Sequence, residues 1–171
     1  NLRTPLVIVN QFLQGQGSNA VQSTGRFLVN STVGVFGLID VAERIGLEEK
    51  EEDFGQTLAT WGVGDGFYIV LPLFGPSNLR DTTGMVMTMM TDPINAYVVS
   101  EGEAWIVPMR TAANAVDQRS KIIDEVNALR DNSVDYYAAV RSSYYQNRNA
   151  AINNIDDSEL TPLPLISIEF E

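Results

Sequence analysis

The 171-residue chain contains no cysteine and no histidine. A Cys/His metal site, a cysteine nucleophile and a histidine general base are therefore excluded, and with them the commonest hydrolase and metalloenzyme mechanisms. No apolar run approaches the ~20 residues that a membrane-spanning helix needs. A chain of this length is expected to fold as one domain without disulfide or metal cross-links. We expect no catalytic residue, no metal and no cofactor.

Basic residues are scarce, with 11 Lys and Arg against 22 Asp and Glu and a net charge of -11. Most of the excess acid lies in residues 40–53 and in the tail, residues 156–171. The rest of the chain is close to neutral and has no basic stripe, so binding to nucleic acid or attraction to an anionic lipid surface is not expected. We interpret the acidic run from Glu48 to Asp53 as a solvated loop.

Helical patterns dominate the rest of the sequence, which predicts an all-α fold. Caps are expected at Thr4, Ser18, Ser77 and at Asp53, which has Gln56 three residues further on. Pro5 suits the first position of a helix. The predicted helical segments are residues 4–14, 18–30, 53–61, 77–90, 103–129 and 134–153.

An unusual segment separates the third and fourth of these helices. Gly62, Gly64 and Gly66 run into an apolar octet, Phe67 to Phe74. The glycines indicate a hinge and not a phosphate loop, because a helix and not a strand precedes them. Pro72 lacks a backbone donor, which argues against a central strand, so we expect a buried and mobile apolar segment.

The tail contains two prolines and then alternates apolar and polar residues, which is typical of an extended segment. No internal repeat or low-complexity linker interrupts the chain. We therefore predict a single compact domain of short amphipathic helices over residues 1–155, followed by an acidic and apolar tail over residues 156–171.

The carboxylates allow two interpretations. Asp40, Asp65, Asp81 and Asp92 could supply an acid/base pair, but sequence spacing gives no sign that any two lie close together, and surface or capping roles are the default. Arg80 and Asp81 directly follow the apolar segment, where a charged pair needs a partner or a polar channel. A structural ion pair and a place at the mouth of a ligand path both remain open.

Two further clusters favour either packing or binding. Four methionines lie within six residues, and flexible methionine side chains suit either a core or an adaptable apolar surface. The last predicted helix combines tyrosines with arginines, which is typical either of an interface or of core tyrosines beside exposed arginines. The residues are Met85, Met87, Met89, Met90, Tyr136, Tyr137, Tyr144, Tyr145, Arg141 and Arg148.

Several motifs together resemble a known family. The motifs are FLQG at 12–15, RFLVNSTVGVFGLIDVA at 26–42, FGQTLATWGVGDGFYIVLPLFGPSNLRDTTG at 54–84 and SVDYYAAVRSSYYQNR at 133–148. Their order and spacing over most of the chain are similar to those of the VacJ/MlaA family of outer-membrane phospholipid-trafficking lipoproteins. The central block is long enough to be specific.

The resemblance implies a helical disc in the periplasmic leaflet of a Gram-negative outer membrane, around a central amphipathic pore. Phospholipids mislocalised to the outer leaflet would pass inward through this pore, which maintains lipid asymmetry. Expected partners are phospholipid, a trimeric porin and a periplasmic lipid carrier of the MlaC type. The resemblance implies no enzymatic activity.

The same resemblance implies site residues. Candidates for the lipid path or pore are Asn30, Asp40, Gly62, Gly64, Gly66, Phe67, Tyr68, Pro72, Phe74, Arg80 and Asp81. Candidates for contact with the carrier or another partner are Tyr136, Arg141, Tyr145 and Arg148.

The chain also departs from the family pattern. Family precursors carry a signal peptide and a lipidated N-terminal cysteine, whereas this chain begins at Asn1, so we interpret it as processed or trimmed and infer the lipid anchor from the resemblance. Two alternatives to lipid transport remain, a soluble helical interaction module of the periplasm and an enzyme using paired aspartates.

Overall fold

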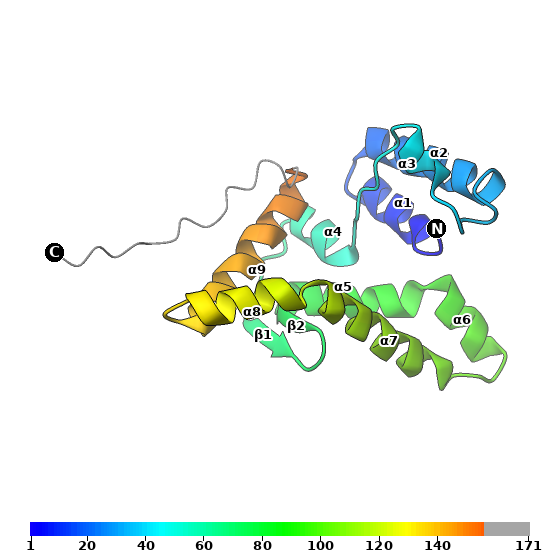
Figure 1. The fold of residues 1–171 in the computed structure, drawn as a ribbon. Helices are drawn as coiled ribbons and strands as arrows, with labels where there is room; N and C mark the ends of the chain where they lie inside the picture. Colours follow the sequence, from blue (N-terminus) through cyan, green and yellow to red (C-terminus); the bar gives the residue numbers. More distant parts are fainter. Residues whose placement is uncertain (156–171) are drawn as a thin grey trace.

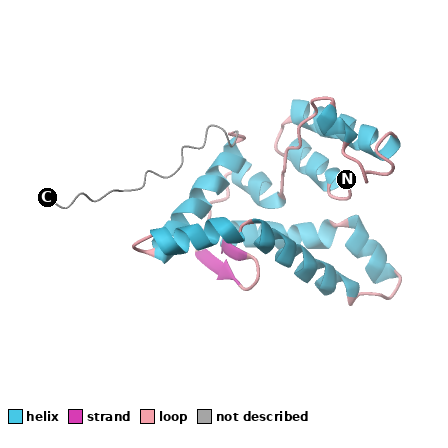
Figure 2. Ribbon diagram, in the orientation of Figure 1, coloured by secondary structure: helices cyan, strands magenta, loops and turns pink. Residues whose placement is uncertain are grey.

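The computed structural model of the chain describes residues 1–155, apart from the side chain of residue 125. Within these residues it contains nine helices and one two-stranded antiparallel sheet, which confirms the all-α prediction (Figures 1 and 2). The predicted tail, 156–171, lies outside the described residues. The elements are α1 (Thr4–Leu13), α2 (Gly17–Thr32), α3 (Val41–Arg44), α4 (Phe54–Thr60), β1 (Tyr68–Leu71), β2 (Gly75–Asn78), α5 (Leu79–Thr91), α6 (Pro93–Ser100), α7 (Ile106–Lys121), α8 (Ile123–Asn132) and α9 (Tyr136–Asn153).

One of the four expected helix caps is confirmed. Asp53 caps α4, and its carboxylate accepts a hydrogen bond from the backbone N–H of Gln56. At α5 the cap is Asn78 and not Ser77, because the Asn78 side chain accepts from the N–H of Asp81 at 2.7 Å. The N-cap of α1 is Arg3, one residue before Thr4, and the N-cap of α2 is Gln16, two residues before Ser18. Neither side chain makes a capping hydrogen bond.

The predicted helix over residues 103–129 is wrong as a single element. It begins at Ile106, and the backbone leaves helical geometry at Ile122, which separates α7 from α8. The short helices α3 and α6 were not predicted. Asp40 and Asp92 are their N-caps and accept hydrogen bonds from backbone N–H groups in the first turn. Such short helices show no apolar periodicity in the sequence, and the caps mark where they begin.

The interpretation of the apolar octet is also wrong. Tyr68–Leu71 pairs with Gly75–Asn78 as a hairpin, and Pro72 lies in the turn, where its missing donor breaks no ladder bond. Both strands are edge strands, since the sheet has only two. The segment is not buried either, because Phe67 is 80% exposed and Leu73 is 65% exposed.

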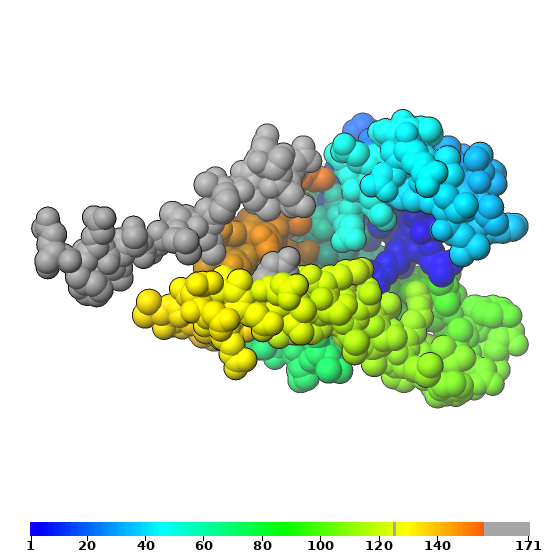
Figure 3. All heavy atoms as spheres, in the orientation of Figure 1, coloured from blue at the N-terminus to red at the C-terminus, as the bar shows by residue number. Residues whose placement is uncertain are grey.

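The helices form two groups. Figure 1 shows α1, α2 and α3 together in blue to cyan, set above α5 to α8, with α4 and α9 between them and the hairpin on the far side of α5 to α8 from α1. The space-filling view shows the same separation between the blue and cyan helices and the green and yellow ones (Figure 3).

The interior of the described residues is polar. The hydrophobic residues that are buried there are all alanines: Ala20, Ala42, Ala115 and Ala150. Buried polar residues outnumber them and include Asn10, Thr57, Asn78 and Arg80. No helix within 1–155 combines the length and the apolar character that crossing a membrane requires. Polar groups therefore hold the centre, while large apolar side chains lie at intermediate or exposed positions.

Helices α4 and α5 cross at two glycines. A Cβ atom added to Gly84 would lie 2.3 Å from the backbone nitrogen of Gly55, and one added to Gly55 would lie 2.6 Å from a carboxylate oxygen of Asp81. Such distances leave no room for a methyl group. Glycine within a helix costs up to ~1 kcal/mol relative to alanine, so both positions trade helix propensity for close approach.

We expect Gly84→Ala to lower the free energy of unfolding by about 2 kcal/mol, because backbone must move to admit the methyl group. Gly25→Ala in α2 is the matched control, since an added Cβ there meets only a leucine methyl at 4.0 Å. This control is expected to raise stability by up to ~1 kcal/mol. Urea unfolding of both variants tests the crossing, and equal effects at the two glycines would contradict it.

Candidate functional site

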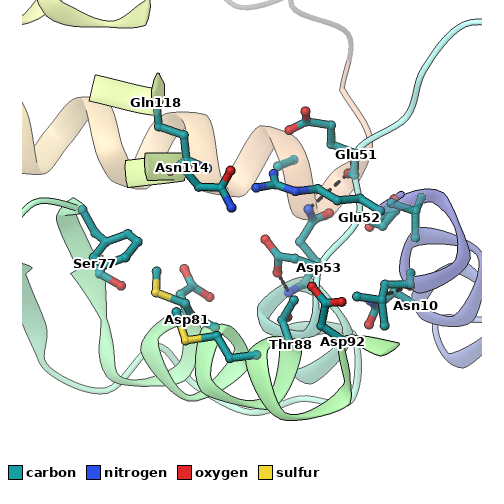
Figure 4. Close-up of a pocket in the computed structure, with 18 of the residues that line it drawn as sticks. Asn10, Glu51, Glu52, Asp53, Ser77, Asp81, Thr88, Asp92, Asn114 and Gln118 are labelled. Atoms are coloured by element: carbon teal, nitrogen blue, oxygen red, sulfur yellow. Dashed lines mark hydrogen bonds between the residues drawn. The ribbon is translucent and has the colours of Figure 1, made fainter. Parts of the chain in front are cut away.

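A cavity of about 540 Å³ opens between the two groups of helices. It is lined by α1, the acidic loop 48–53, α4, α5, α7, α9 and part of the hairpin. Figure 4 shows Asp53, Asp81 and Asp92 around the open space, with Asn114 and Gln118 of α7 across from them. Leu6, Val7, Met85 and Met89 add apolar surface. We call it the polar cavity.

Arg148 of α9 forms the central ion-pair network at this cavity. Its Nη1 and Nη2 atoms donate to both carboxylate oxygens of Asp53, at 2.8 and 2.7 Å, and Nη2 also donates to Asp81 Oδ1 at 3.0 Å. The Nε atom lies 2.7 Å from Asp81 Oδ2, an ion-pair contact without hydrogen-bond geometry. One guanidinium thus joins the cap of α4 to the first turn of α5.

Tyr144 and Arg80 complete the surroundings of Asp81. The Tyr144 hydroxyl donates to Asp81 Oδ2 at 2.5 Å, and burial together with this bond raises the pKa of the phenol well above its usual range. Arg80 donates from Nε to Asp81 Oδ1 at 3.0 Å, and its Nη1 lies 2.5 Å from Asp65. Arg80 and Asp81 therefore form a structural ion pair, which is one of the two interpretations that the sequence allowed.

Burial alone would raise the pKa of Asp53, but the hydrogen bonds and the charge of Arg148 outweigh it and hold that pKa below its usual value. Glu52, the preceding residue, differs. It is 7% exposed and burial raises its pKa, and within residues 1–155 its carboxylate accepts a hydrogen bond only from Gln14, at 2.9 Å. The acidic run is therefore not a uniformly solvated loop, because its last two residues are built into the cavity wall.

A second cavity, of about 1250 Å³, lies between the hairpin, α7, α8 and α9. Its wall is mainly aliphatic and aromatic, with residues such as Val70, Leu71, Val126 and Val140. We call it the apolar cavity. Four residues line both cavities, which are therefore adjacent across one wall: Pro76, Tyr144, Arg148 and Ala151.

Arg110 provides a second cation at the polar cavity. Its Nη1 donates to Asp92 at 2.7 Å and to the side-chain oxygen of Asn95 at 2.9 Å. Because Asp92 also caps α6, this contact ties α7 to the start of α6. Among the described residues, no group of three His, Cys, Asp or Glu side chains could hold a metal ion.

The structure places three of the predicted pore candidates at a cavity. Phe74 and Asp81 line the polar cavity, and Tyr68 lines the apolar one. Arg80 lies behind Asp81, and Phe67 and Pro72 lie at the surface near the hairpin. The three glycines are exposed in the segment before β1, where Gly62 and Gly66 adopt positive φ angles.

Asn30 and Asp40 lie outside both cavities, in the group formed by α1 to α3. Asn30 accepts from the backbone N–H groups of Val41 and Ala42, both at 2.9 Å, and donates to Asp40. Asp40 caps α3 and forms an ion pair with Arg26. The two residues are joined to each other and hold α3 against α2.

The tyrosines and arginines of α9 gather around the hairpin. The Tyr68 ring lies within 6.1 Å of the rings of Tyr137, Tyr144 and Tyr145, and the Arg141 guanidinium lies 5.6 Å from its centre. Tyr136 lines the apolar cavity. Of the four candidates for partner contact, Tyr136 and Arg141 are exposed, whereas Arg148 is committed to the internal ion-pair network.

Sequence reasoning missed several residues of the cavity, notably Glu52, Asp53, Gln56, Tyr144 and Arg110. Asp53 was assigned only a capping role, and its capping geometry gave no signal of the ion pair to a residue 95 positions away. A signal did exist in Gly55 and Gly84, because a glycine inside a helical pattern usually has a packing reason. It pointed to the crossing beneath the cavity.

Comparisons with known proteins agree with one another. The MlaA lipoprotein family matches residues 1–151. The chain is 37% identical over 153 residues to protein RP093 of Rickettsia prowazekii, covering 89% of this chain and 59% of that protein. It is 34% identical over 166 residues to the intermembrane phospholipid transport system lipoprotein MlaA of Escherichia coli, covering 95% of this chain and 62% of that protein. It therefore spans about three fifths of the length of these relatives.

A solved structure is similar as well. It is described as the structural basis for maintenance of bacterial outer membrane lipid asymmetry, with a TM-score of 0.73 and 33% identity over 90% of this chain and 75% of that one.

Replacing Arg148 by Met should lower the free energy of unfolding by about 3 kcal/mol, because half-buried Asp53 would lose its cation and largely buried Asp81 would keep only Arg80. Arg141→Met on the same helix is the control, and we expect it to change stability by no more than ~1 kcal/mol, the scale of an exposed cation–π contact. Chemical denaturation compares the two. An equal loss of unfolding free energy in the two variants would contradict a special role of the Arg148 network.

The lowered pKa of Asp53 also predicts a pH dependence. The stability that its ionised form contributes is present above the unfolded-state pKa of about 4 and is lost as pH falls through the lower folded-state value. Unfolding measured from pH 6 to pH 2.5 should show this loss. In Asp53→Asn the curve should be flatter, and an unchanged slope would contradict the assignment.

Proposed function

Because the chain belongs to the MlaA lipoprotein family, we propose that it forms the outer-membrane part of a phospholipid transport system. In this proposal it takes phospholipids that are mislocalised to the outer leaflet, passes them inward through an amphipathic passage and delivers them to a periplasmic carrier. The names of its relatives, an intermembrane phospholipid transport system lipoprotein in both Escherichia coli and Haemophilus influenzae, support this assignment.

The observation that carries the proposal is the pair of adjacent cavities of opposite character. A phospholipid has a charged head and apolar tails, so its binding site must offer both surfaces within one molecule's length. The polar cavity offers charged groups, and the apolar cavity, which shares four wall residues with it, offers aliphatic surface. Ligand sites of this kind combine a mainly apolar lining with a few placed polar groups.

The outer surface supports a position in a lipid leaflet. Val33, Val35, Phe36, Leu38 and Ile39 are all exposed in the loop between α2 and α3, and Phe36 is 89% exposed. Exposed apolar surface on this scale marks an interaction site. The molecule has a polar interior and apolar side chains on its surface, and this arrangement fits a position in a membrane leaflet, where lipid tails contact the apolar side chains.

Backbone geometry in the same loop supports a functional reason for the exposure. Val35 and Phe36 both have positive φ angles, 53° and 58°, and a β-branched residue such as valine rarely adopts them. Neighbouring Gly34 is tightly enclosed, since an added Cβ would lie 2.2 Å from the carbonyl oxygen of Ile39. Strained residues that present apolar side chains outward fit a segment that inserts between lipids.

The proposal includes no chemical step. Asp81 and Asp53 share Arg148, Asp65 pairs with Arg80, and Asp40 and Asp92 cap helices, so each of these carboxylates has a structural partner. The exposed apolar surface also disfavours the alternative of a soluble interaction module, which would place its large apolar side chains in a core. A passive conducting role remains the function that best fits the two cavities.

The partners in this proposal follow from the family. A porin trimer would contact the exposed apolar outer surface, and a carrier of the MlaC type would dock at the α8–α9 end, where Tyr136 and Arg141 are exposed. Tyr145 and Arg148, the other two candidates, would affect docking only indirectly. Tyr145 packs against Tyr68 and Tyr144, and Arg148 pairs with Asp53 and Asp81. Anchoring to the membrane by a lipidated cysteine ahead of this chain belongs to the same proposal.

Substitution at the shared wall tests the passage. Ala151→Phe should narrow the junction of the two cavities, so cells that depend on this variant should accumulate phospholipid in the outer leaflet, measured by its accessibility to an added phospholipase. Ala138→Phe on the exposed part of α9 is the control and should retain transport. Full transport by a stably folded Ala151→Phe variant would contradict the passage.

Extraction from native membranes in mild detergent, followed by mass spectrometry of bound lipids and proteins, tests the proposal as a whole. Phospholipid together with a porin is expected. A lipid-free, monodisperse protein in plain buffer would contradict the proposal and favour a soluble module.

A further inference from the structure

Most of the charges at the polar cavity are paired. Arg148 holds Asp53 and Asp81, and Arg110 holds Asp92. Glu49 lies 3.4 Å from Arg26, in an ion pair behind the wall. Arg3, Glu51 and Glu52 also line this cavity without an ion-pair partner within residues 1–155. Arg3 and Glu51 are exposed, whereas only 7% of the surface of Glu52 is exposed.

An unpaired carboxylate in such a position is costly for the protein alone. Ionised carboxylates lose hydration on burial, and proteins normally compensate this with a cation. Gln14 donates a single amide bond to Glu52, which is weaker compensation than a charge. Burial raises the pKa of Glu52 and the neighbouring negative Asp53 raises it further, while the bond from Gln14 and the more distant charges of Arg148 and Lys50 offset only part of this rise. A ligand that carries a positive charge would supply the missing partner.

Gln56 gives a second and independent sign of a donor-bearing ligand at the same wall. It lines the polar cavity and is 4% exposed. Its amide nitrogen donates to the carbonyl of Glu51, but its side-chain oxygen has no donor among the described residues. Buried acceptors are nearly always satisfied, so this enclosed oxygen has capacity for a donor that the described residues do not supply.

The surroundings decide what kind of cation this is. The described part of the chain holds no cluster of three ligands for a metal ion, which disfavours a divalent cation. The shared wall with the apolar cavity favours an amphiphile, because the rest of the ligand can lie on aliphatic surface. Arg110 of α7 lines the same cavity and could face a phosphate.

From this arrangement we infer that the polar cavity prefers phospholipids whose head group carries a primary ammonium, the ethanolamine class, over head groups with no positive charge, such as glycerol. Glu52 contacts the ammonium, and Gln56 accepts a further hydrogen bond from it. The inference rests on the proposed function, since it names which phospholipid that same passage takes.

The test uses the full chain incorporated into nanodiscs or detergent micelles that contain equal amounts of phosphatidylethanolamine and phosphatidylglycerol. Native mass spectrometry then gives the ratio of the two bound lipids. We expect phosphatidylethanolamine to be enriched roughly tenfold, the scale of one charge-assisted hydrogen bond. In Glu52→Gln, which keeps the acceptor for Gln14 but removes the charge, the ratio should fall to near one.

Glu43→Gln on the exposed face of α3 is the matched control, because it makes the same change in net charge away from the cavity. It should keep the enrichment. The free energy of unfolding gives a second readout, since removal of an unpaired buried charge should not lower it. A destabilised Glu52→Gln protein with unchanged lipid ratio would show a structural role and overturn the inference.

The outcomes separate the two proposals. Bound phospholipid with no head-group preference would overturn the inference and leave the proposed function standing, whereas no bound phospholipid would overturn the proposed function itself. Adding free ethanolamine separates the possible sources of the ammonium. Its capture without any enrichment of phosphatidylethanolamine would overturn the assignment to a lipid head group.

Discussion

The ion-pair network of Arg148 with Asp53 and Asp81 is the interaction on which the rest of the structure depends. It lies directly over the crossing of α4 and α5, where Gly55 and Gly84 bring the two backbones together, and an added Cβ at Gly55 would lie 2.4 Å from the guanidinium. Because Arg148 belongs to α9, the same contacts fix α9 against α4 and α5, and other residues of α9 line the apolar cavity. Three elements distant in the sequence are thus positioned by one side chain, and both cavities take their shared wall from it.

A fold held by polar groups at its centre has consequences for its surface. Because alanines and paired polar residues fill the interior of the described residues, the larger apolar side chains lie at intermediate or exposed positions in the loop 33–39, the hairpin and α5 to α7. In water such a surface would be unfavourable. In a lipid leaflet it would be favourable. Under the proposed function, the polar interior would then provide the path that a charged head group needs, and the internal network and the external apolar surface would serve that one function.

Particular elements show how far the sequence could be interpreted. The pattern of apolar residues predicted α1, α2, α4, α5 and α9 to within a few residues, because these helices are long or carry a strong cap. It failed at residues 103–129, where the break at Ile122 involves neither glycine nor proline, and at α3 and α6, which are too short to show a period. Pro72 argued correctly against a central strand, because it lies in the turn between two edge strands. It gave no sign that the residues before and after this turn pair with each other as a hairpin.

The candidate site shows the same division between local and distant information. The sequence by itself determined the family, the helical class, the absence of histidine and cysteine chemistry, and the cap at Asp53, since each follows from residue type or local order. Only the tertiary structure decided that Arg148 reaches Asp53 and Asp81, that Glu52 is buried without an ion-pair partner among the described residues, and that Asn30 and Asp40 hold α3 outside both cavities. The physical reason is that ion pairing and burial depend on distance in space, and residues 95 positions apart reveal nothing of that distance until the helices pack.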